Sequence, residues 1–356
     1  MKELVIQEQV IQPGEKKLID LKVGVLTTHE PVTMRAWVLR GKRDGPTLMV
    51  TGCIHGDEIN GAEIIRRLVN APSLKKSFKG TLIAVPIVNV PAFSNRSRYL
   101  PDRRDLNRLF PGSPKGSLGG RLAHVLTSEL LPHCDAVIDF HTGAVNRANL
   151  PQVRVTTDDE DSLALCQAFG SPATLQSSVI EGTFRAACNK ANVPVVLYES
   201  GEALRLDTPS IRFGLRGAHT VMRHLGMLPK RPAAAKKRAK HAVLCEKGHW
   251  ERAQIGGLFT PFIALGKAVK KGDVLGFIAD PLGDYEEEVT ASYSGILVGR
   301  TNEGQADEGD ALFHIAIVKY PNRAEKRIVK SGEGLPDIPD DDDDHPVPYD
   351  PYTDVI

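Results

Sequence analysis

The sequence predicts an α/β protein with a mostly parallel, mixed sheet that carries helices on both faces, followed by a small all-β domain. In the first 228 residues, continuous apolar runs of strand length alternate with segments of helical periodicity. This alternation is typical of a parallel sheet that is buried on both sides. The pattern ends at a basic, alanine-rich stretch, and short apolar runs separated by frequent glycine turns follow it. Such spacing indicates a compact all-β unit.

The elements of the α/β part can be placed in chain order. Strands at 23–26 and 32–39 predict an opening β-hairpin. Four apolar runs then predict the strands of the sheet, at residues 48–50, 82–90, 136–140 and 193–198. Apolar residues recur at helical spacing between several of these strands, over residues 62–69 and 121–131. A closing helix is predicted over 207–228, with a buried stripe of Ile211, Leu215, Ala218, Met222 and Leu225.

The chain is too long for one compact core, because single cores stop growing near about 250–300 residues. We therefore expect four parts. They are a large domain that includes the hairpin (1–228), a basic linker (229–240), a small all-β module (241–322) and an acidic, proline-rich tail (323–356). A solvated linker is the simplest interpretation of the basic stretch.

The small module has two weakly similar halves. Residues 257–259 lead to a glycine turn at 271–275, and residues 295–297 lead to a similar turn at 308–312. This pattern resembles the lipoyl/biotinyl barrel-sandwich. A carrier of that kind needs a lysine on the hairpin between its halves, and residues 273–318 contain none. The sequence therefore predicts a barrel-sandwich-like module with a structural or gating role.

Composition limits the classes of partner. The formal net charge is +1, which gives no overall attraction to nucleic acid or to a membrane surface. No apolar run approaches the roughly 18 residues of a membrane span, and the first residues lack the apolar core of a signal peptide. The five cysteines are dispersed, without a C-x-x-C pair, as expected of reduced thiols. We expect a cytoplasmic protein that acts on a small molecule, either as a monomer or as a homo-oligomer.

The chemistry is centred on His55 and Glu58. This H-x-x-E pair follows the apolar run at 48–50 and precedes the first helical segment. An imidazole and a carboxylate three residues apart at a helix start can be directed at one point, which would form half of a zinc site. A catalytic zinc needs three protein ligands and keeps a fourth position open for water.

Two further strand ends carry the other candidates. His141 follows the run at 136–140, and Glu199 follows the run at 193–198. In an open parallel sheet, sites form outside the carboxyl ends of the strands, so these groups should converge with His55. A His, Glu, His set is the hydrolase type of zinc site, and zinc can lower the pKa of water from about 15.7 to about 7. Glu199 is the best candidate for the general base, although a capping or salt-bridging carboxylate is the common alternative.

A charged loop lies between the predicted ligands. Five of its seven residues from Asp102 to Arg108 are charged. Guanidinium groups bind carboxylates in a bidentate way and can stabilise a developing oxyanion. The alternative is a basic surface loop, but its place between the ligands favours a functional interpretation.

Four motifs occur in order: HGDEING at 55–61, RYLPDRRDLNRLFPG at 98–112, DFHTG at 139–143 and YESG at 198–201. They resemble the succinylglutamate desuccinylase/aspartoacylase family of the zinc carboxypeptidase-like superfamily, and the similarity spans about residues 10–320. The resemblance implies a zinc carboxypeptidase-like fold and one zinc ion per chain, held by His55, Glu58 and His141.

The resemblance also implies roles for other side chains. Glu199 would be the base that activates water and later protonates the leaving amine. Asn107 and Arg108 would hold the substrate carboxylate. The arginine that polarises the scissile carbonyl would be Arg98, by its place before Tyr99. Arg104 remains an alternative, because sequence spacing does not distinguish the two.

The predicted function is zinc-dependent hydrolysis of the amide bond of an N-acyl amino acid or a similar small amide with a carboxylate. A metallocarboxypeptidase that acts on short peptides could use the same residues, and the size of the cleft would separate the two. A non-catalytic zinc-binding or small-molecule-binding protein is a third reading. Glu199 argues against this reading, because a binding protein needs no base beside an open zinc position.

Overall fold

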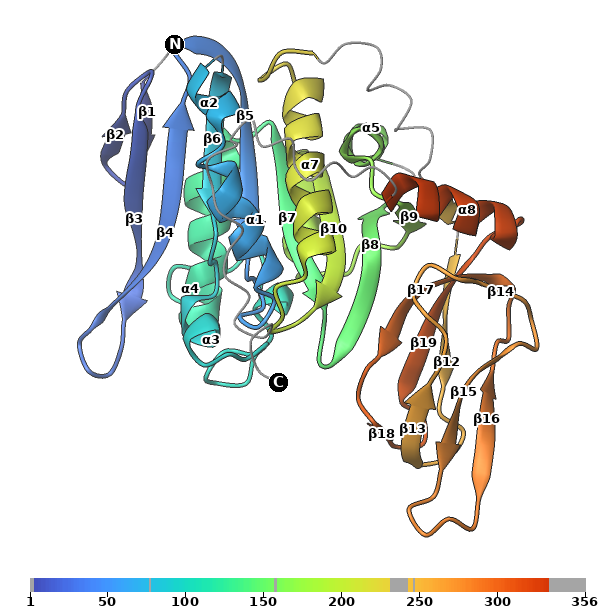
Figure 1. Ribbon diagram of the computed structural model, residues 1–356. Helices are drawn as coiled ribbons and strands as arrows, with labels where there is room; N and C mark the ends of the chain where they lie inside the picture. The colour runs from blue at the N-terminus through green and yellow to red at the C-terminus, as the bar shows by residue number, and fades with distance from the viewer. Residues whose placement is uncertain (1–2, 77, 157–158, 231–242, 246, 333–356) are drawn as a thin grey trace, which may run out of the picture.

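The structure, a computed structural model, describes residues 3–76, 78–156, 159–230, 243–245 and 247–332. Four parallel strands form the centre of its main sheet (Figure 1). In spatial order they are β6 (Lys79–Val85), β5 (Arg43–Gly52), β7 (Ala136–Gly143) and β10 (Val195–Glu202). Each neighbouring pair is parallel. The predicted parallel sheet is therefore confirmed, and its apolar runs are buried as expected.

One predicted strand, 82–90, is too long. β6 ends at Val85, and helix α3 (Val90–Ser94) begins after a short loop. The side chain of Asn89 caps this helix by accepting a hydrogen bond from the N–H of Ala92, and Pro91 occupies its first turn. Asparagine at the N-cap and proline in the first turn both favour a helix start. The chain therefore turns into a helix here, although Val88 and Val90 on either side of Asn89 favour a strand.

Antiparallel strands extend the parallel core on both sides. The predicted N-terminal hairpin is present as β3 (Lys16–Val25) and β4 (Pro31–Arg40), although β3 begins seven residues before the predicted strand at 23–26, and β4 pairs with β6. The opposite side consists of strands that the sequence did not predict: β8 (Arg147–Val155), which pairs with β10, then β9 (Ala173–Gln176) and β11 (Val243–Cys245). A small unpredicted hairpin, β1 (Leu4–Ile6) and β2 (Gln9–Ile11), buries Ile6 and Ile11.

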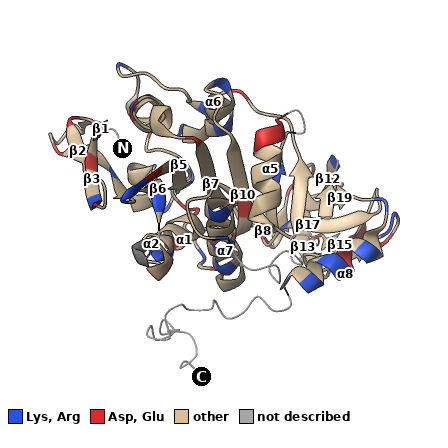
Figure 2. Ribbon diagram, turned by 90° about the horizontal axis from the view of Figure 1, so that it is seen from above, with Lys and Arg blue, Asp and Glu red and all other residues tan. Residues whose placement is uncertain are grey.

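Helices cover both faces of the sheet, as expected. One apolar core joins the sheet to α1 (Asn60–Leu68), α2 (Pro72–Lys76), α5 (Glu160–Phe169) and α7 (Thr208–His224). The core on the other face contains α4 (Leu118–His124), the π-helical turn η2 (Val125–Leu130) and α6 (Phe184–Lys190). Figure 2 shows α6 on one side of the parallel strands and α1 and α7 on the other. Four of the five predicted stripe residues of α7 are buried, and the fifth, Leu225, packs partly buried against the same core.

The C-terminal module continues the main sheet. β17 (Gly295–Thr301) pairs antiparallel with β8, and β19 (Ala311–Ile317) and β12 (Lys247–Arg252) follow it. The short β14 (Ala268–Val269) also pairs with β17. A second sheet has the order β16 (Glu286–Thr290), β15 (Val274–Ala279), β13 (Gly257–Pro261) and β18 (Gln305–Ala306). The predicted domain division near residue 241 therefore does not interrupt the hydrogen-bonded sheet.

The two halves of the module have matching geometry. Gly272 and Gly309 both adopt a φ of 90°, in the turns that the sequence aligned. A Cβ atom at Gly257 would lie 2.3 Å from the carbonyl oxygen of Ala279, and a Cβ at Gly295 would lie 2.3 Å from that of Ala316. The internal similarity that the sequence suggested thus has a structural counterpart, because both halves need glycine at the same two positions.

The end of the described chain differs from the predicted tail. Residues 323–332, assigned to that tail, belong to helix α8 (Pro321–Gly332), whose Ala324 and Ile328 pack against the sheet. Lys and Arg residues recur along this helix, as the blue segments of its ribbon show (Figure 2). Most of the predicted linker, from residue 231, and the tail from residue 333 lie outside the described residues. Among the helices that the structure describes, none has the length and apolar content needed to cross a bilayer.

Candidate active site

The loop between β5 and α1 carries His55 and Glu58, and Asn89 holds this loop in place. The N–H of Asn89 donates to the carbonyl oxygen of Cys53 (2.9 Å), and its Nδ2 donates to that of Ile54 (3.1 Å). Within the loop, the N–H of Glu58 donates to the carbonyl oxygen of His55 (3.2 Å). These bonds fix a tight turn that directs both side chains inward, where His55 is 3% exposed and Glu58 1%.

The structure brings His55, Glu58 and His141 together. Nδ1 of His55 lies 2.7 Å from Oε1 of Glu58, and Nδ1 of His141 lies 2.7 Å from Oε2 of the same carboxylate. One ligand atom from each residue can be chosen so that all lie within 4.8 Å of one another. His141 comes from the end of β7, next to the strand that leads to His55. Strand ends that are far apart in sequence thus form one buried cluster.

Two carboxylates that the sequence reading did not single out orient the histidines. Oδ2 of Asp139 lies 2.8 Å from Nε2 of His141, and Oδ1 of Asp105 lies 3.2 Å from Nε2 of His55. Asp139 itself accepts a hydrogen bond from Oγ1 of Thr51 (2.7 Å). A signal for Asp139 was present, because residues two apart in a strand share a face. Asp105 lies in the charged loop, where spacing alone did not connect it with His55.

The charges of the cluster stabilise one another. Burial opposes ionisation of Glu58, but the charges of His55 and His141 outweigh it and lower the pKa of this carboxyl. Burial also disfavours both imidazolium ions. The charge of Glu58 nevertheless raises the pKa of His55, and the charges of Asp139 and Glu58 hold the pKa of His141 well above its usual range. The site is therefore built to place positive charge around one buried carboxylate.

This donor set fits a divalent metal ion. Each histidine directs Nδ1 toward Glu58 and has a carboxylate at Nε2, an arrangement that fixes the tautomer and leaves Nδ1 as the ligand atom. A metal ion can replace the two imidazole protons, because binding requires neutral imidazole and releases protons. Two histidines and one glutamate are a ligand set found in zinc hydrolases.

Glu199 lies beside this cluster. In the parallel pairing of β10 with β7, Glu199 is directly opposite His141, so both side chains project from the same face of the sheet. Its Oε2 accepts a hydrogen bond from Nδ2 of Asn149 (3.0 Å), and its Oε1 lies 3.5 Å from Nε of Arg154. Both partners come from β8, a strand that the sequence reading missed. Glu199 is therefore held by polar partners and is not part of the His–Glu–His cluster itself.

The structure separates the two candidate arginines. Arg98 is mostly buried and donates to Oε1 of Glu58 (3.1 Å) and to Oδ2 of Asp105 (3.1 Å). The side chain of Arg104 is 55% exposed and lies 3.6 Å from Asp102. Of these two arginines, Arg98 is therefore the one that contacts Glu58 and Asp105.

Asn107 and Arg108 lie at the outer side of the same loop. The N–H of Asn107 donates to Oδ1 of Asp105 (2.8 Å), and Oδ1 of Asn107 accepts from the N–H of Phe184 (2.9 Å). The Oδ1 atom of Asn107 is thus already engaged, and its Nδ2 is the atom that can donate to a ligand. Arg108 is exposed, and its Nη1 donates to the carbonyl oxygen of Asn107 (2.7 Å). The pair is linked to His55 through Asp105.

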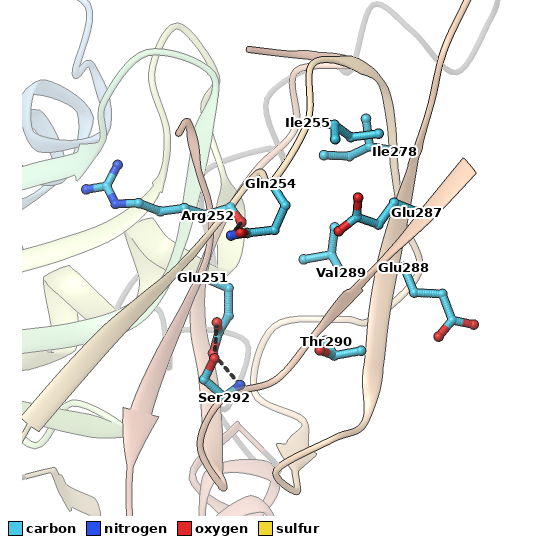
Figure 3. Close-up of a pocket in the computed structure, with 10 residues that line it drawn as sticks. All are labelled: Glu251, Arg252, Gln254, Ile255, Ile278, Glu287, Glu288, Val289, Thr290 and Ser292. Atoms are coloured by element: carbon cyan, nitrogen blue, oxygen red, sulfur yellow. Dashed lines mark hydrogen bonds between the residues drawn. The ribbon is translucent and has the colours of Figure 1, made fainter. Parts of the chain in front are cut away.

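A hollow of about 330 Å³ opens in the C-terminal module, away from this cluster (Figure 3). It is lined by β12, β15, β16 and the adjoining turns, and it shares no residue with the predicted site. Its most buried acid, Glu251, already accepts hydrogen bonds from the N–H (2.6 Å) and Oγ (2.8 Å) of Ser292. The cluster of His55, Glu58 and His141 therefore remains the candidate site.

Comparison with known proteins identifies relatives of this chain. Residues 44–225 match the family described as succinylglutamate desuccinylase/aspartoacylase catalytic domain. The chain is 28% identical over 298 residues to the N-alpha-acetyl-L-2,4-diaminobutyric acid deacetylase of Halomonas elongata, which covers 81% of this chain and 85% of that protein.

Two solved structures also superpose on most of this chain. The succinylglutamate desuccinylase/aspartoacylase of Rhodobacter sphaeroides superposes with a TM-score of 0.77 at 27% identity, covering 87% of this chain and 97% of that one. The product-bound ectoine utilization protein EutE (DoeB) of Ruegeria pomeroyi gives a TM-score of 0.76 at 25% identity, with coverages of 86% and 97%. The family match spans more than half of the chain and includes all four motifs. This chain therefore belongs to the succinylglutamate desuccinylase/aspartoacylase family.

Proposed function

We propose that this protein is a zinc-dependent hydrolase that cleaves the amide bond of an N-acyl amino acid. The observation that carries the proposal is the buried cluster of His55, Glu58 and His141, with Glu199 directly opposite His141 in the sheet. When bound there, a zinc ion supplies Lewis acidity, which polarises a carbonyl group and makes water a stronger acid. His55, Glu58 and His141 would hold this ion through two neutral imidazoles and one carboxylate.

The other residues have separate roles in this proposal. Glu199 takes a proton from the attacking water and delivers it to the leaving amine nitrogen, which is general base and then general acid catalysis. Arg98, held by Glu58 and Asp105, presents fixed N–H donors to the carbonyl oxygen as negative charge develops on it. Asn107 and Arg108 bind the carboxylate of the amino acid through charge-assisted hydrogen bonds.

The proposed substrate class has two sources of support. Arg108 places an exposed guanidinium group in the loop beside the site, and this group suits a substrate with a carboxylate. The name of the Halomonas relative describes deacetylation of an N-acetylated amino acid. We extend to this chain the general class, a small N-acyl amino acid, and place no restriction on the acyl group.

The two arginines provide a test of the site. We expect Arg98→Ala to lower kcat by about 10²–10³-fold, the usual cost of removing one oxyanion donor, because Glu58 and Asp105 hold the Arg98 guanidinium beside the cluster. The matched change Arg104→Ala should alter kcat less than about twofold, since its side chain is 55% exposed and its ion-pair partner among the described residues is Asp102. Steady-state kinetics of the two variants decide the matter. A larger loss in the Arg104 variant would transfer the role to Arg104.

The proposed function is tested by activity on a matrix of acyl groups and amino acids, with released amine as the readout. We expect hydrolysis of at least one N-acyl amino acid, loss of activity after treatment with a chelator and recovery on addition of zinc. Short peptides in the same matrix separate a deacylase from a carboxypeptidase. Activity that persists in fully metal-free protein would refute the zinc dependence, and zinc-loaded protein inactive on every amide would refute the hydrolase.

A further inference from the structure

The C-terminal module is connected to Glu199 through Asn149. Nδ2 of Asn149 donates to Oε2 of Glu199 (3.0 Å), and Asn149 is 8% exposed. In the sheet, Asn149 on β8 lies directly opposite Gly299 on β17. A Cβ atom at position 299 would lie 2.9 Å from Oδ1 of Asn149 and 3.2 Å from Cβ of His314. The Asn149 amide thus occupies space that any residue other than glycine at position 299 would need.

A second link connects the same strands. The N–H of Asn302, just after β17, donates to the carbonyl oxygen of Asn146 (2.7 Å), and its Nδ2 donates to Oε2 of Glu202 (3.0 Å). Asn146 lies in the turn that follows His141, and Glu202 is three residues beyond Glu199. The module therefore holds the segments that follow both the metal-binding strand end and the strand end with the base.

We propose that Asn149 is a positioning residue for Glu199, and that Gly299 of the C-terminal module keeps Asn149 in this contact. The inference rests on the proposed function, because it takes Glu199 as the general base. A carboxylate with an amide donor on one oxygen and Arg154 near the other is restricted to one orientation. Proton transfer requires the base to stay within hydrogen-bond reach of its proton, so restricting its orientation raises turnover without adding affinity for substrate.

The test compares Asn149→Ala, Gly299→Ala, the double variant and the control Gly304→Ala. Gly304 lies in the same module, and a Cβ there would meet nothing within 4 Å. We expect each of the first two changes to lower kcat by about tenfold to a hundredfold, the range for a hydrogen bond to a charged group. KM and zinc content should stay unchanged, and the control should match the parent protein.

The double variant carries the decisive result. If Gly299→Ala acts by displacing Asn149, it has nothing left to displace in the Asn149→Ala background, so the double variant should be no slower than Asn149→Ala alone. Losses that multiply would show that Gly299 acts independently of Asn149 and would overturn the proposal. So would a Gly299→Ala protein with the parent kcat.

A crystal structure of the Gly299→Ala protein gives a readout that needs no activity. We expect the Asn149 amide to turn away, so that its Nδ2 no longer lies within hydrogen-bond distance of Glu199. A contact kept at its present 3.0 Å would contradict the proposal. If Gly299→Ala does not fold, Asn149→Ala remains a test, since an unchanged kcat in that variant removes the positioning role. If the parent protein hydrolyses no amide, the proposed function fails, and the crystal structure still decides the contact.

Discussion

The His55→Ala protein is expected to lose its zinc and, with it, nearly all activity. Nδ1 of His55 lies 2.7 Å from Glu58, and removal of this imidazole leaves only one histidine and one carboxylate for the metal. Replacing residues that merely orient a metal ligand commonly weakens metal binding by about 10–100-fold. We therefore expect a loss of more than about 100-fold from removing the ligand itself. Elemental analysis of dialysed protein, together with kcat at saturating substrate, measures both effects.

His224→Ala is the matched control. His224 ends α7 and is exposed, with no part in the cluster, so this variant should keep its zinc and its turnover. A full zinc complement in the His55→Ala protein would show that residue 55 is not a ligand. The metal site would then have to be placed elsewhere in the chain.

The Glu199→Gln protein is expected to keep its full zinc content while its kcat falls by about 10²–10⁴-fold. It should therefore differ from the His55→Ala protein, which loses both. Glutamine keeps the size of the side chain and can still meet Asn149, but it cannot accept the proton of the attacking water. Because Glu199 lies beside the cluster and not within it, metal binding should not change. Zinc analysis and steady-state kinetics on the same preparation test both halves of this expectation.

Glu286→Gln serves as the control for this change, since Glu286 is an exposed residue of the C-terminal module. Turnover at the parent level in the Glu199→Gln protein would remove Glu199 from the mechanism. Loss of zinc in that protein would instead indicate that Glu199 belongs to the metal site, and the distinction between base and ligand would have to be redrawn.

The parallel core was predictable because its strands are buried on both faces and read as continuous apolar runs. β8 was not predictable by the same rule. One of its faces carries Asn149, Gln152 and Arg154, polar residues that lie along the site, so the strand shows no clear apolar run. The strand whose side chains hold Glu199 was therefore found only in the structure. Its polar residues face the site, and they replace the apolar residues by which a strand is predicted.

Part of the candidate site could be predicted from the sequence. The sequence was sufficient to predict that His55, Glu58, His141 and Glu199 lie close together. The prediction used the spacing of His55 and Glu58 and the positions of His141 and Glu199 after apolar runs. The sequence could not predict which of Arg98 and Arg104 lies beside the cluster, because this depends on the path of the backbone between them. Arg103 has a φ of +66°, and the N–H of Leu100 donates to the carbonyl oxygen of Arg104 (3.0 Å). This tight turn sends Arg104 to solvent, and no spacing rule encodes it.

The pairing of β8 with β17 and of β9 with β11 has a further consequence. If the chain were cut before residue 243, β9 and residues 147–149 of β8 would become sheet edges with unsatisfied peptide N–H and C=O groups, while residues 152–155 of β8 would still pair with β9. Bare edges of this kind act as templates for other strands and promote self-association. The strands of the C-terminal module thus cover edges of the amino-terminal sheet that would otherwise be open to pairing with other chains.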